Sequence, residues 1–355
     1  MEKRWKNKLK YLIINFYTLL LAFIYNIINE MNLLLTKTKE REEIQMKDYL
    51  GYKDKVCVVT GVSSGMGEAT AKVLLSLGAK VYGLDMNSPK VKNLTSFIKC
   101  NLAHKKDIDE AFKIIPDHVD SFFGVAGLSG AKTDYRTTFD CNYTANMYIT
   151  LKYLAKRMTK GGSIVYCTST AGQEWKRFKR EQNKVVHCTT WKEVQESTKK
   201  LADSAPSTFA YMYSKRCLSQ FACEQAVAFA KKGIRINNVM PGSTDTGMKQ
   251  EFQDMVGSEE GLIAEAGLAG RLATSDEMAF PMVFLNSDMA SFIAGVDLAV
   301  DYVDTCLKEL GLKKNLEAVS ATNPIICAIA KRMMNKSANN MKALNEGKGE
   351  IENKK

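Results

Sequence analysis

The amino-acid sequence predicts an α/β fold with a single doubly wound parallel sheet covered by helices on both faces. Two observations predict it. Short apolar runs rich in β-branched and aromatic residues alternate with helical patterns of ten or more residues, which is typical of a covered parallel sheet. The composition, 45% hydrophobic and 25% charged, is that of an ordinary soluble globular protein, and 355 residues suffice for one large core with appendages.

The strands and helices alternate regularly through most of the chain. Helical patterns occupy the residues before Gly78 and then residues 106–115, 141–158 and 207–231. The last of these helices is expected to begin after Pro206, with its cap near Ser207 or Thr208. The strands are expected at residues 55–60, 80–85, 96–102, 119–127, 163–169 and 234–242.

One segment, residues 173–208, interrupts this alternation. It is highly charged, and it contains no strand pattern between the strand at 163–169 and the helix that begins near residue 207. We interpret it as a helical insertion on the surface. A solvated loop, the rim of a pocket and a subunit contact are the alternatives.

The two ends of the chain carry most of its positive charge. Residues 1–45 have a net charge of +3 and residues 312–355 have +5, out of +11 for the whole chain. A nucleic-acid-binding domain would concentrate its basic residues within the fold, so we expect no nucleic-acid partner. The chain is expected to comprise an N-terminal extension (1–45), one domain (46–311) and a basic, partly helical tail (312–355).

Residues 11–28 form an uncharged, largely apolar run of 18 residues, which is the lower limit for a membrane span. Five basic residues precede the run and favour a cytoplasmic N-terminus, so a span would place the rest of the chain outside the cell. An interfacial anchor and a translation start at Met46 are the alternatives, and we favour them. Membrane association is expected only through residues 11–28.

The cysteines and histidines suggest neither a disulfide framework nor a metal site. The nine cysteines include no CxxC pair, and most lie in apolar runs, which indicates buried thiols in a reducing compartment such as the cytoplasm. The three histidines lie at unrelated spacings.

Three glycines follow the first expected strand and lead into a helical pattern: Gly61, Gly65 and Gly67. Glycines at this place let the chain turn tightly and bring backbone N–H groups against a pyrophosphate at a helix N-terminus. Asp85 ends the second strand, where a carboxylate accepts hydrogen bonds from ribose hydroxyls and repels a 2′-phosphate. No Lys or Arg lies between Gly61 and Gly67 or directly after Asp85. The pattern predicts a Rossmann-type site for NAD rather than NADP.

Two tyrosines stand shortly before Lys215, and only one of them can share its face of a helix. Tyr211 lies four residues before the lysine, whereas Tyr213 is turned about 200° away from Tyr211. An ammonium beside a phenol favours the phenolate and lowers its pKa towards working pH. We therefore expect Tyr211 to be the reactive ring and Tyr213 to pack or face solvent.

Taken together, these motifs resemble those of the short-chain dehydrogenase/reductase family, over roughly residues 53–303. The TGxxxGxG pattern of that family matches Thr60 to Gly67, and its YxxxK pattern matches Tyr211 to Lys215. Its active-site serine, its helix asparagine and its PGxxxT pattern match Ser169, Asn142 and Pro241 to Thr246.

The sequence also departs from the family pattern at several positions. Val125 replaces the asparagine of an NAG motif, Asn101 replaces an acid, and Asp301-Tyr302-Val303 stands where the family has DGG. About 42 residues separate Ser169 from Tyr211. This long spacing resembles the 3α-hydroxysteroid dehydrogenase/carbonyl reductase branch.

The resemblance implies a role for each matched residue. Tyr211 is the general base, Lys215 lowers its pKa and binds the nicotinamide ribose, and Ser169 hydrogen-bonds the substrate oxygen. Asn142 would hold a water that links Lys215 to solvent, and Thr246 would hold the carboxamide. The full expected set has Asn142, Ser169, Tyr211 and Lys215 as catalytic residues. For NAD binding it has Thr60, Gly61, Ser63, Ser64, Gly65, Met66, Gly67, Asp85, Asn101, Leu102, Ala126, Gly127, Tyr211, Lys215, Pro241, Gly242, Thr244 and Thr246.

Residues 247–270 follow the PGxxxT pattern, where the family has a substrate lid. The apolar residues Met248, Phe252, Met255 and Leu262 are expected to face a flat hydrophobic substrate; a helix that buries them in the core is the alternative.

The resemblance implies an enzyme that interconverts a secondary alcohol and a ketone on an apolar substrate, first of all a 3α-hydroxysteroid or bile acid. An aromatic alcohol such as coniferyl alcohol, or a nucleotide-binding regulator without turnover, is the alternative. We also expect a homo-oligomer, a dimer or a tetramer, in the cytoplasm.

Overall fold

The computed structural model describes residues 25–33, 49–315 and 318–329. The chain divides into two units, Met1–Tyr49 and Leu50–Lys355. In the first unit, residues 25–33 are helical and exposed. Most of the run 11–28 and the proposed start at Met46 lie outside the described residues. Within the described part of the chain, none of the helices combines the length and hydropathy of a membrane span.

The second unit is built on a sheet of seven strands in the order β3-β2-β1-β4-β5-β6-β7. Every pairing in it is parallel. The strand order reverses between β1 and β4, and ligands of such sheets bind at the carboxyl ends of the strands beside this switch point. The bounds are β1 Val56–Thr60, β2 Lys80–Asp85, β3 Ser96–Lys99, β4 Ser121–Gly124, β5 Ser163–Cys167, β6 Arg235–Pro241 and β7 Asp297–Val300.

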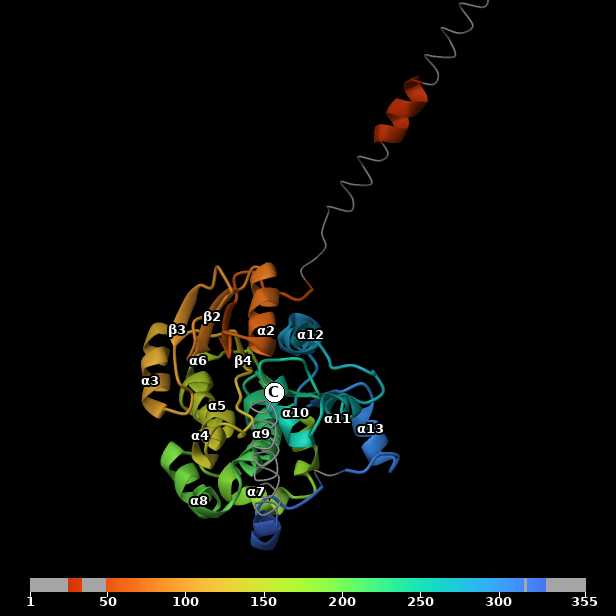
Figure 1. Cartoon of the computed structure of the whole chain (residues 1–355). Helices are drawn as coiled ribbons and strands as arrows, with labels where there is room; N and C mark the ends of the chain where they lie inside the picture. The colour runs from red at the N-terminus through yellow and green to blue at the C-terminus, as the bar shows by residue number, and fades with distance from the viewer. Residues whose placement is uncertain (1–24, 34–48, 316–317, 330–355) are drawn as a thin grey trace, which may run out of the picture. The chain divides into compact units, whose positions relative to one another are not determined.

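The expected doubly wound fold and its six strands are confirmed, and β7 is a seventh strand that our sequence analysis did not assign. The sheet is covered on both faces. One core cluster lies under α2 and α12, which pack against each other, and the other lies under α3, α5 and α9 (Figure 1). The helices are α2 Gly65–Ser76, α3 Lys105–Ile114, α4 Tyr135–Phe139, α5 Ala145–Ile149, α6 Ala155–Arg157, α7 Lys179–Val186, α8 Trp191–Ser204, α9 Ser207–Ala230, α10 Lys249–Val256, α11 Glu259–Ala264, α12 Ser275–Asn286 and α13 Asp304–Glu309.

The helical pattern at 141–158 belongs to a longer helical stretch that runs from α4 to α6. Two π-helical turns interrupt it, η1 Asp140–Thr144 and η2 Thr150–Leu154. π-Helical turns inside helices are rare and are frequent at functional sites. The first of them contains Asn142.

The insertion contributes to the core and is not purely a surface feature. Its helices are α7, α8 and the short η3 Thr170–Trp175, so it is helical as expected and is not a solvated loop. Apolar side chains of both α7 and α8 are buried in the same core cluster as α9, and the ring of Trp191 contacts that of Tyr148 edge-on. This apolar face was not recognised in the sequence because the few buried apolar positions lie among many charged and polar residues.

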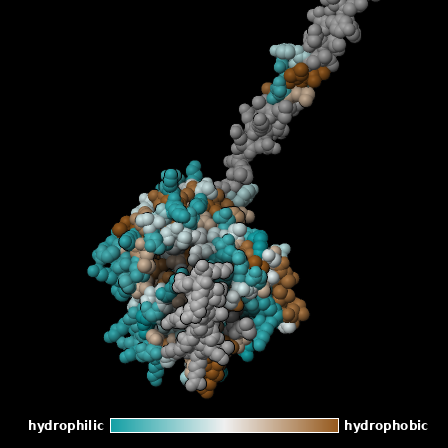
Figure 2. All heavy atoms as spheres, in the orientation of Figure 1, coloured by the Kyte–Doolittle hydropathy of each residue, from teal (hydrophilic) through white to brown (hydrophobic). Residues whose placement is uncertain are grey.

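The ordered fold also continues past residue 311, where we expected the domain to end. Ala321 and Cys327 are buried in the core, and the guanidinium of Arg216 donates a hydrogen bond to the backbone carbonyl of Val319 at 2.9 Å. Figure 2 shows a hydrophobic area at the end of α13, where Leu310 and Leu312 are exposed.

Candidate active site

The three glycines after β1 form a tight turn into α2. Gly61 and Gly65 have positive φ angles of 80° and 56°, which favour glycine. A Cβ on Gly67 would lie 2.1 Å from the carbonyl oxygen of Gly61, so no side chain fits there. The turn therefore leaves open space in front of the N-terminus of α2.

A pocket of ≈ 390 Å³ lies in front of this turn. We call it the glycine cradle. Asp85 at the end of β2 lines it, and its carboxylate accepts hydrogen bonds from the backbone N–H groups of Ser63 (3.0 Å) and Asn87 (2.9 Å). Other lining residues that were expected from the sequence are Gly61, Ser63, Ser64, Gly65, Met66, Gly67, Asn101, Leu102, Ala126, Gly127 and Thr246.

These residues fit a dinucleotide. The turn without side chains admits a pyrophosphate at the helix N-terminus, and Asp85 presents a carboxylate at the place of a ribose. Among the described residues that line the glycine cradle there is no lysine or arginine. A 2′-phosphate would therefore meet a carboxylate and no cation.

Thr60 was expected to bind the cofactor, but it does not line the glycine cradle. Its hydroxyl is buried and accepts hydrogen bonds from the backbone N–H groups of Val125 (2.9 Å) and Ala126 (3.1 Å). It therefore fixes the loop after β4, whose residues Ala126 and Gly127 do line the cradle.

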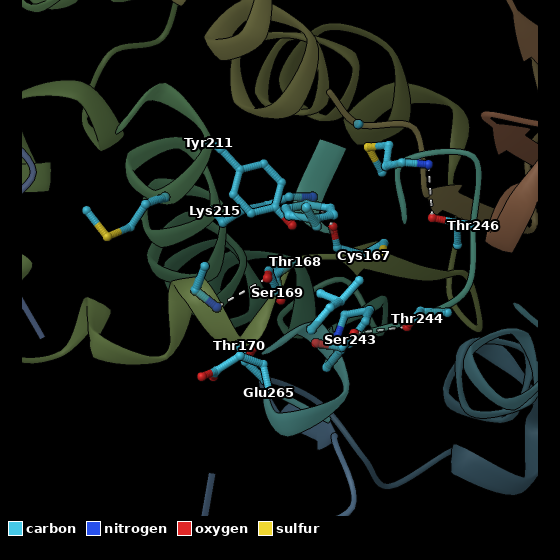
Figure 3. A pocket seen from close by; sticks show the side chains of 18 of the residues that line it. Cys167, Thr168, Ser169, Thr170, Tyr211, Lys215, Ser243, Thr244, Thr246 and Glu265 are labelled. Carbon is cyan, nitrogen blue, oxygen red and sulfur yellow. Dashed lines mark hydrogen bonds between the residues drawn. The ribbon is translucent and has the colours of Figure 1, made fainter. Parts of the chain in front are cut away.

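A second pocket, of ≈ 290 Å³, contains the expected catalytic side chains. We call it the tyrosine pocket. Ser169, two residues after β5, and Tyr211 and Lys215 on α9 all line it. Pro241 at the end of β6 and Gly242, Thr244 and Thr246 from the following loop line it as well. Figure 3 shows Tyr211, Lys215 and Ser169 grouped together, with Thr246 on one side of them. The two pockets share five lining residues: Met66, Val125, Gly127, Thr246 and Met248.

Tyr211 and Lys215 share one face of α9, as the spacing predicted. The ammonium nitrogen of Lys215 lies 5.6 Å from the centroid of the Tyr211 ring and donates a hydrogen bond to the backbone carbonyl of Cys167 at 2.7 Å. Burial lowers the pKa of Lys215, and the neighbouring thiols of Cys167 and Cys141 oppose this shift. The lysine is thus held at a fixed place behind the pocket.

Ser169 directly precedes η3 and is buried, with an exposed fraction of 8%. Its Oγ accepts a hydrogen bond from the backbone N–H of Ala171 at 3.1 Å. The hydroxyl hydrogen remains available to donate to an oxygen in the pocket.

Asn142 lies behind the two pockets and lines neither of them. Its Oδ1 accepts from the backbone N–H of Leu128 (2.8 Å), and its Nδ2 donates to the carbonyl of Leu128 (2.9 Å) and to Ser214 (3.2 Å). A Cβ on Gly127 would lie 3.4 Å from Asn142 Oδ1 and 3.5 Å from Lys215 Nζ, so Asn142 and Lys215 flank Gly127. The side-chain contacts of Asn142 fix the loop after β4, which we had not inferred.

The lid segment closes over the tyrosine pocket. Met248, Phe252, Met255 and Leu262 all line it, and the Phe252 ring contacts Tyr211 edge-on with centroids 5.4 Å apart. The described part of α10 buries none of its residues in the core. The expectation of an apolar wall over the substrate therefore agrees with the structure better than a core helix does.

Some lining residues escaped the sequence analysis. Cys167 and Thr168 contribute through their place at the end of β5, and Glu265 and Lys308 bring charges into the tyrosine pocket. No sequence signal marks Glu265 or Lys308, because one directly follows a short helix with acidic residues and the other lies in a helix with charges of both signs.

Comparison with known proteins identifies the family. Residues 55–180 match the family described as short chain dehydrogenase, and residues 194–302 match the one described as enoyl-(acyl carrier protein) reductase. A coniferyl-alcohol dehydrogenase from Pseudomonas sp. (strain HR199 / DSM 7063) is 33% identical over 249 residues, which cover 70% of this chain and 95% of that protein. The chain belongs to the short-chain dehydrogenase family and is an NAD(P)-dependent oxidoreductase.

Solved structures share the fold. A short chain dehydrogenase family protein from Francisella tularensis subsp. tularensis SCHU S4 is 26% identical with a TM-score of 0.54. The match covers 71% of this chain and 99% of that one. The 3-alpha-hydroxysteroid dehydrogenase from Pseudomonas sp. B-0831, complexed with NADH, is 21% identical with a TM-score of 0.60, and the match covers 72% of this chain and 99% of that one. At that identity the second likeness concerns the fold alone.

Proposed function

We propose that this protein is an NAD-dependent dehydrogenase that oxidises the alcohol group of an aromatic, largely apolar substrate. The observation that carries the proposal is the arrangement of the two pockets. Ser169, Tyr211 and Lys215 line the tyrosine pocket, which opens on the side of Thr246 towards the glycine cradle.

In this proposal Tyr211 takes the proton of the substrate hydroxyl as general base. Ser169 donates a hydrogen bond to the substrate oxygen and fixes its position beside the tyrosine. The buried ammonium of Lys215 favours the phenolate of Tyr211. NAD in the glycine cradle would supply the acceptor for the hydride from the substrate carbon.

Asp85 supports NAD rather than NADP as the cofactor. It presents a carboxylate at the cradle wall, where it accepts hydrogen bonds from ribose hydroxyls and repels a 2′-phosphate. The absence of lysine and arginine among the described lining residues supports the same choice.

Two observations support an aromatic alcohol as the substrate. The relative with 33% identity is named a coniferyl-alcohol dehydrogenase. The tyrosine pocket, at ≈ 290 Å³, is slightly smaller than the range of about 300–1,000 Å³ typical of small-molecule sites. Because a nicotinamide ring near Thr246 would take part of this space, the remainder suits a compact ring better than a four-ring steroid.

A 3α-hydroxysteroid, which was our first choice from the sequence, is the second candidate in this proposal. The apolar lid favours it, because its methionines Met248 and Met255 line the tyrosine pocket and adapt their shape to larger substrates.

The proposal is tested by a spectrophotometric screen for NADH formation with aromatic alcohols, hydroxysteroids and bile acids. We expect turnover with an aromatic alcohol and NAD, and its loss in Tyr211→Phe. Turnover with steroids alone would contradict an aromatic substrate and favour a hydroxysteroid as the substrate. Binding of NAD without turnover of any alcohol would show a nucleotide-binding protein and contradict the proposal.

A further inference from the structure

The tyrosine pocket has a charged end that its proposed chemistry does not use. Glu265, which directly follows α11, and Lys308, on α13, both line this pocket but not the glycine cradle. In Figure 3, Glu265 and Thr246 lie on different sides of the catalytic group, with Ser169 and Ser243 between them. Glu265 therefore lies apart from Thr246, beside which the nicotinamide is expected, and neither charged residue lines the glycine cradle.

Four charged side chains form a network at this end. Lys308 Nζ lies 2.8 Å from Asp304 Oδ2, and Lys313 Nζ lies 2.6 Å from Asp304 Oδ1 and 3.0 Å from Glu265 Oε2. The side chains of Asp304 and Lys308 are only 2% and 4% exposed. Two carboxylates and two ammonium groups balance, so the network as a whole is neutral.

The apolar wall of the pocket makes these charges unusual. Met248, Phe252, Met255 and Leu262 line the same pocket as Glu265 and Lys308. A buried charge costs free energy unless hydrogen bonds compensate it, so polar groups of a ligand gain where they complete such a network. An ammonium group has three donors, and a carboxylate has several acceptor sites, so Lys308 and Glu265 together offer both functions.

A neutral hydroxyl group matches this pair. Its oxygen accepts a hydrogen bond from the ammonium of Lys308, and its hydrogen is donated to the carboxylate of Glu265. A carboxylate matches it less well, because Glu265 would repel it and the neutral network supplies no net positive charge.

We propose that Glu265 and Lys308 form a specificity subsite that binds a second, neutral hydroxyl group of the substrate, remote from the alcohol that reacts. The inference rests on the proposed function, since it requires an alcohol in the tyrosine pocket. It narrows the substrate class to hydroxylated ring alcohols, such as phenols that carry an alcohol side chain.

The test compares two alcohols that differ only at the remote end, cinnamyl alcohol and 4-hydroxycinnamyl alcohol, with NAD in excess. Wild-type protein should prefer the hydroxylated alcohol by at least about 10-fold in kcat/KM, because hydrogen bonds to charged groups discriminate by this much or more. The 4-carboxylated analogue should be the poorest of the three.

Two variants remove the subsite one side at a time. Glu265→Leu and Lys308→Met should each bring the ratio of the two kcat/KM values close to one, chiefly by lowering kcat/KM for 4-hydroxycinnamyl alcohol. Glu259→Leu is the matched control, because Glu259 begins α11, the helix that Glu265 follows, and pairs with Lys249 at 2.7 Å, yet does not line the pocket. It should keep the wild-type ratio.

If Lys308→Met fails to fold, Glu265→Leu alone decides, because its side chain is 38% exposed. Equal kcat/KM values for both alcohols in the wild type, or a preference that survives both variants, would overturn the subsite and leave the four charges as a link between α11 and α13. A wild type that oxidises neither these alcohols nor any other alcohol of the screen would contradict the proposed function, and the subsite with it.

Discussion

The hydroxyl of Tyr213 donates a hydrogen bond to the backbone carbonyl of Glu181, at 2.8 Å. This bond joins α9 to α7 of the insertion, and it holds the Tyr213 ring in the core with 2% exposure. The neighbouring Tyr211, on the opposite face of α9, lines the tyrosine pocket. The two tyrosines before Lys215 therefore have different roles: Tyr211 lines the pocket, and Tyr213 packs α9 against the insertion.

Replacing each tyrosine by phenylalanine distinguishes the catalytic role from the structural one. Tyr211→Phe should lower kcat by about 10²–10⁴-fold, which is the usual contribution of general acid–base catalysis. Tyr213→Phe should leave kcat near the wild-type value, but lower the free energy of unfolding by about 1 kcal/mol, because the carbonyl of Glu181 loses its donor. Kinetics and urea unfolding of both variants provide the measurement. A reversed pattern would show that Tyr213 is the catalytic ring.

Asp85→Ala should change the choice of cofactor. Removing the carboxylate deletes an acceptor for the ribose hydroxyls and a charge that repels a 2′-phosphate, so KM for NAD should rise while KM for NADP falls. We expect the ratio of kcat/KM for NAD to that for NADP to drop by at least about 10-fold, the equivalent of about 1.4 kcal/mol. Asp85→Asn, which keeps an acceptor without the charge, separates the two contributions. A wild type that prefers NADPH would contradict the assignment.

Gly67→Ala should disrupt the glycine cradle. The added Cβ would lie 2.1 Å from the carbonyl oxygen of Gly61, so the turn must shift, at a cost of about 1–3 kcal/mol in stability. Gly261→Ala is the control, because this glycine lies in α11 with its nearest neighbours at 3.4 Å, and alanine favours helices. NAD affinity by calorimetry and thermal unfolding should both fall in the first variant only. Unchanged affinity in Gly67→Ala would mean that the turn does not hold the dinucleotide.

Local spacing explains why so much of this site could be predicted from the sequence. The turn at Gly61 to Gly67 and the pair of Tyr211 and Lys215 each lie within one element, so their geometry follows from strand, turn and helix periods. The order of strands and helices likewise follows from alternating apolar patterns.

The parts that could not be predicted depend on long-range packing. Glu265 and Lys308 meet at one pocket although 43 positions separate them in the chain, and neither differs in its local sequence from an ordinary surface charge. The buried face of the insertion depends on its contact with α9. The short strand β7 is only half-buried at the edge of the sheet, so it lacks the apolar run of a central strand.

Val303→Gly should stabilise the turn between β7 and α13. Val303 has φ = 69° and follows Tyr302 with φ = 46°, a conformation that costs an L-residue about 1–2 kcal/mol. Glycine removes this strain but loses about 0.5–1 kcal/mol through its more flexible unfolded state, so a net gain of up to about 1 kcal/mol is expected. Val303→Ala keeps the Cβ and should gain little. A lower unfolding temperature for Val303→Gly than for the wild type would contradict this. It would show that the contacts of the Val303 side chain stabilise the fold by more than the strain of its backbone destabilises it.

A chain that starts at Met46 should unfold at the same temperature as the full chain and have the same kcat/KM. Among the described residues, the hydrogen bonds that fix the start of the catalytic unit begin at Leu50, whose carbonyl accepts from the backbone N–H of Asp288 at 3.1 Å. Tyr52 follows; it is fully buried, and its hydroxyl donates to the carbonyl of Val283 at 2.7 Å.

A chain that starts at Lys53 is the matched comparison, because it lacks both anchors. Losing the ring of Tyr52 from the core should cost about 3–5 kcal/mol, as for other large aromatic side chains, and should lower the unfolding temperature strongly. Thermal unfolding and kcat/KM of the three chains give the measurement. If the chain from Met46 were as unstable as the chain from Lys53, residues 1–45 would contribute to the fold of the catalytic unit, and the boundary near Leu50 would be wrong.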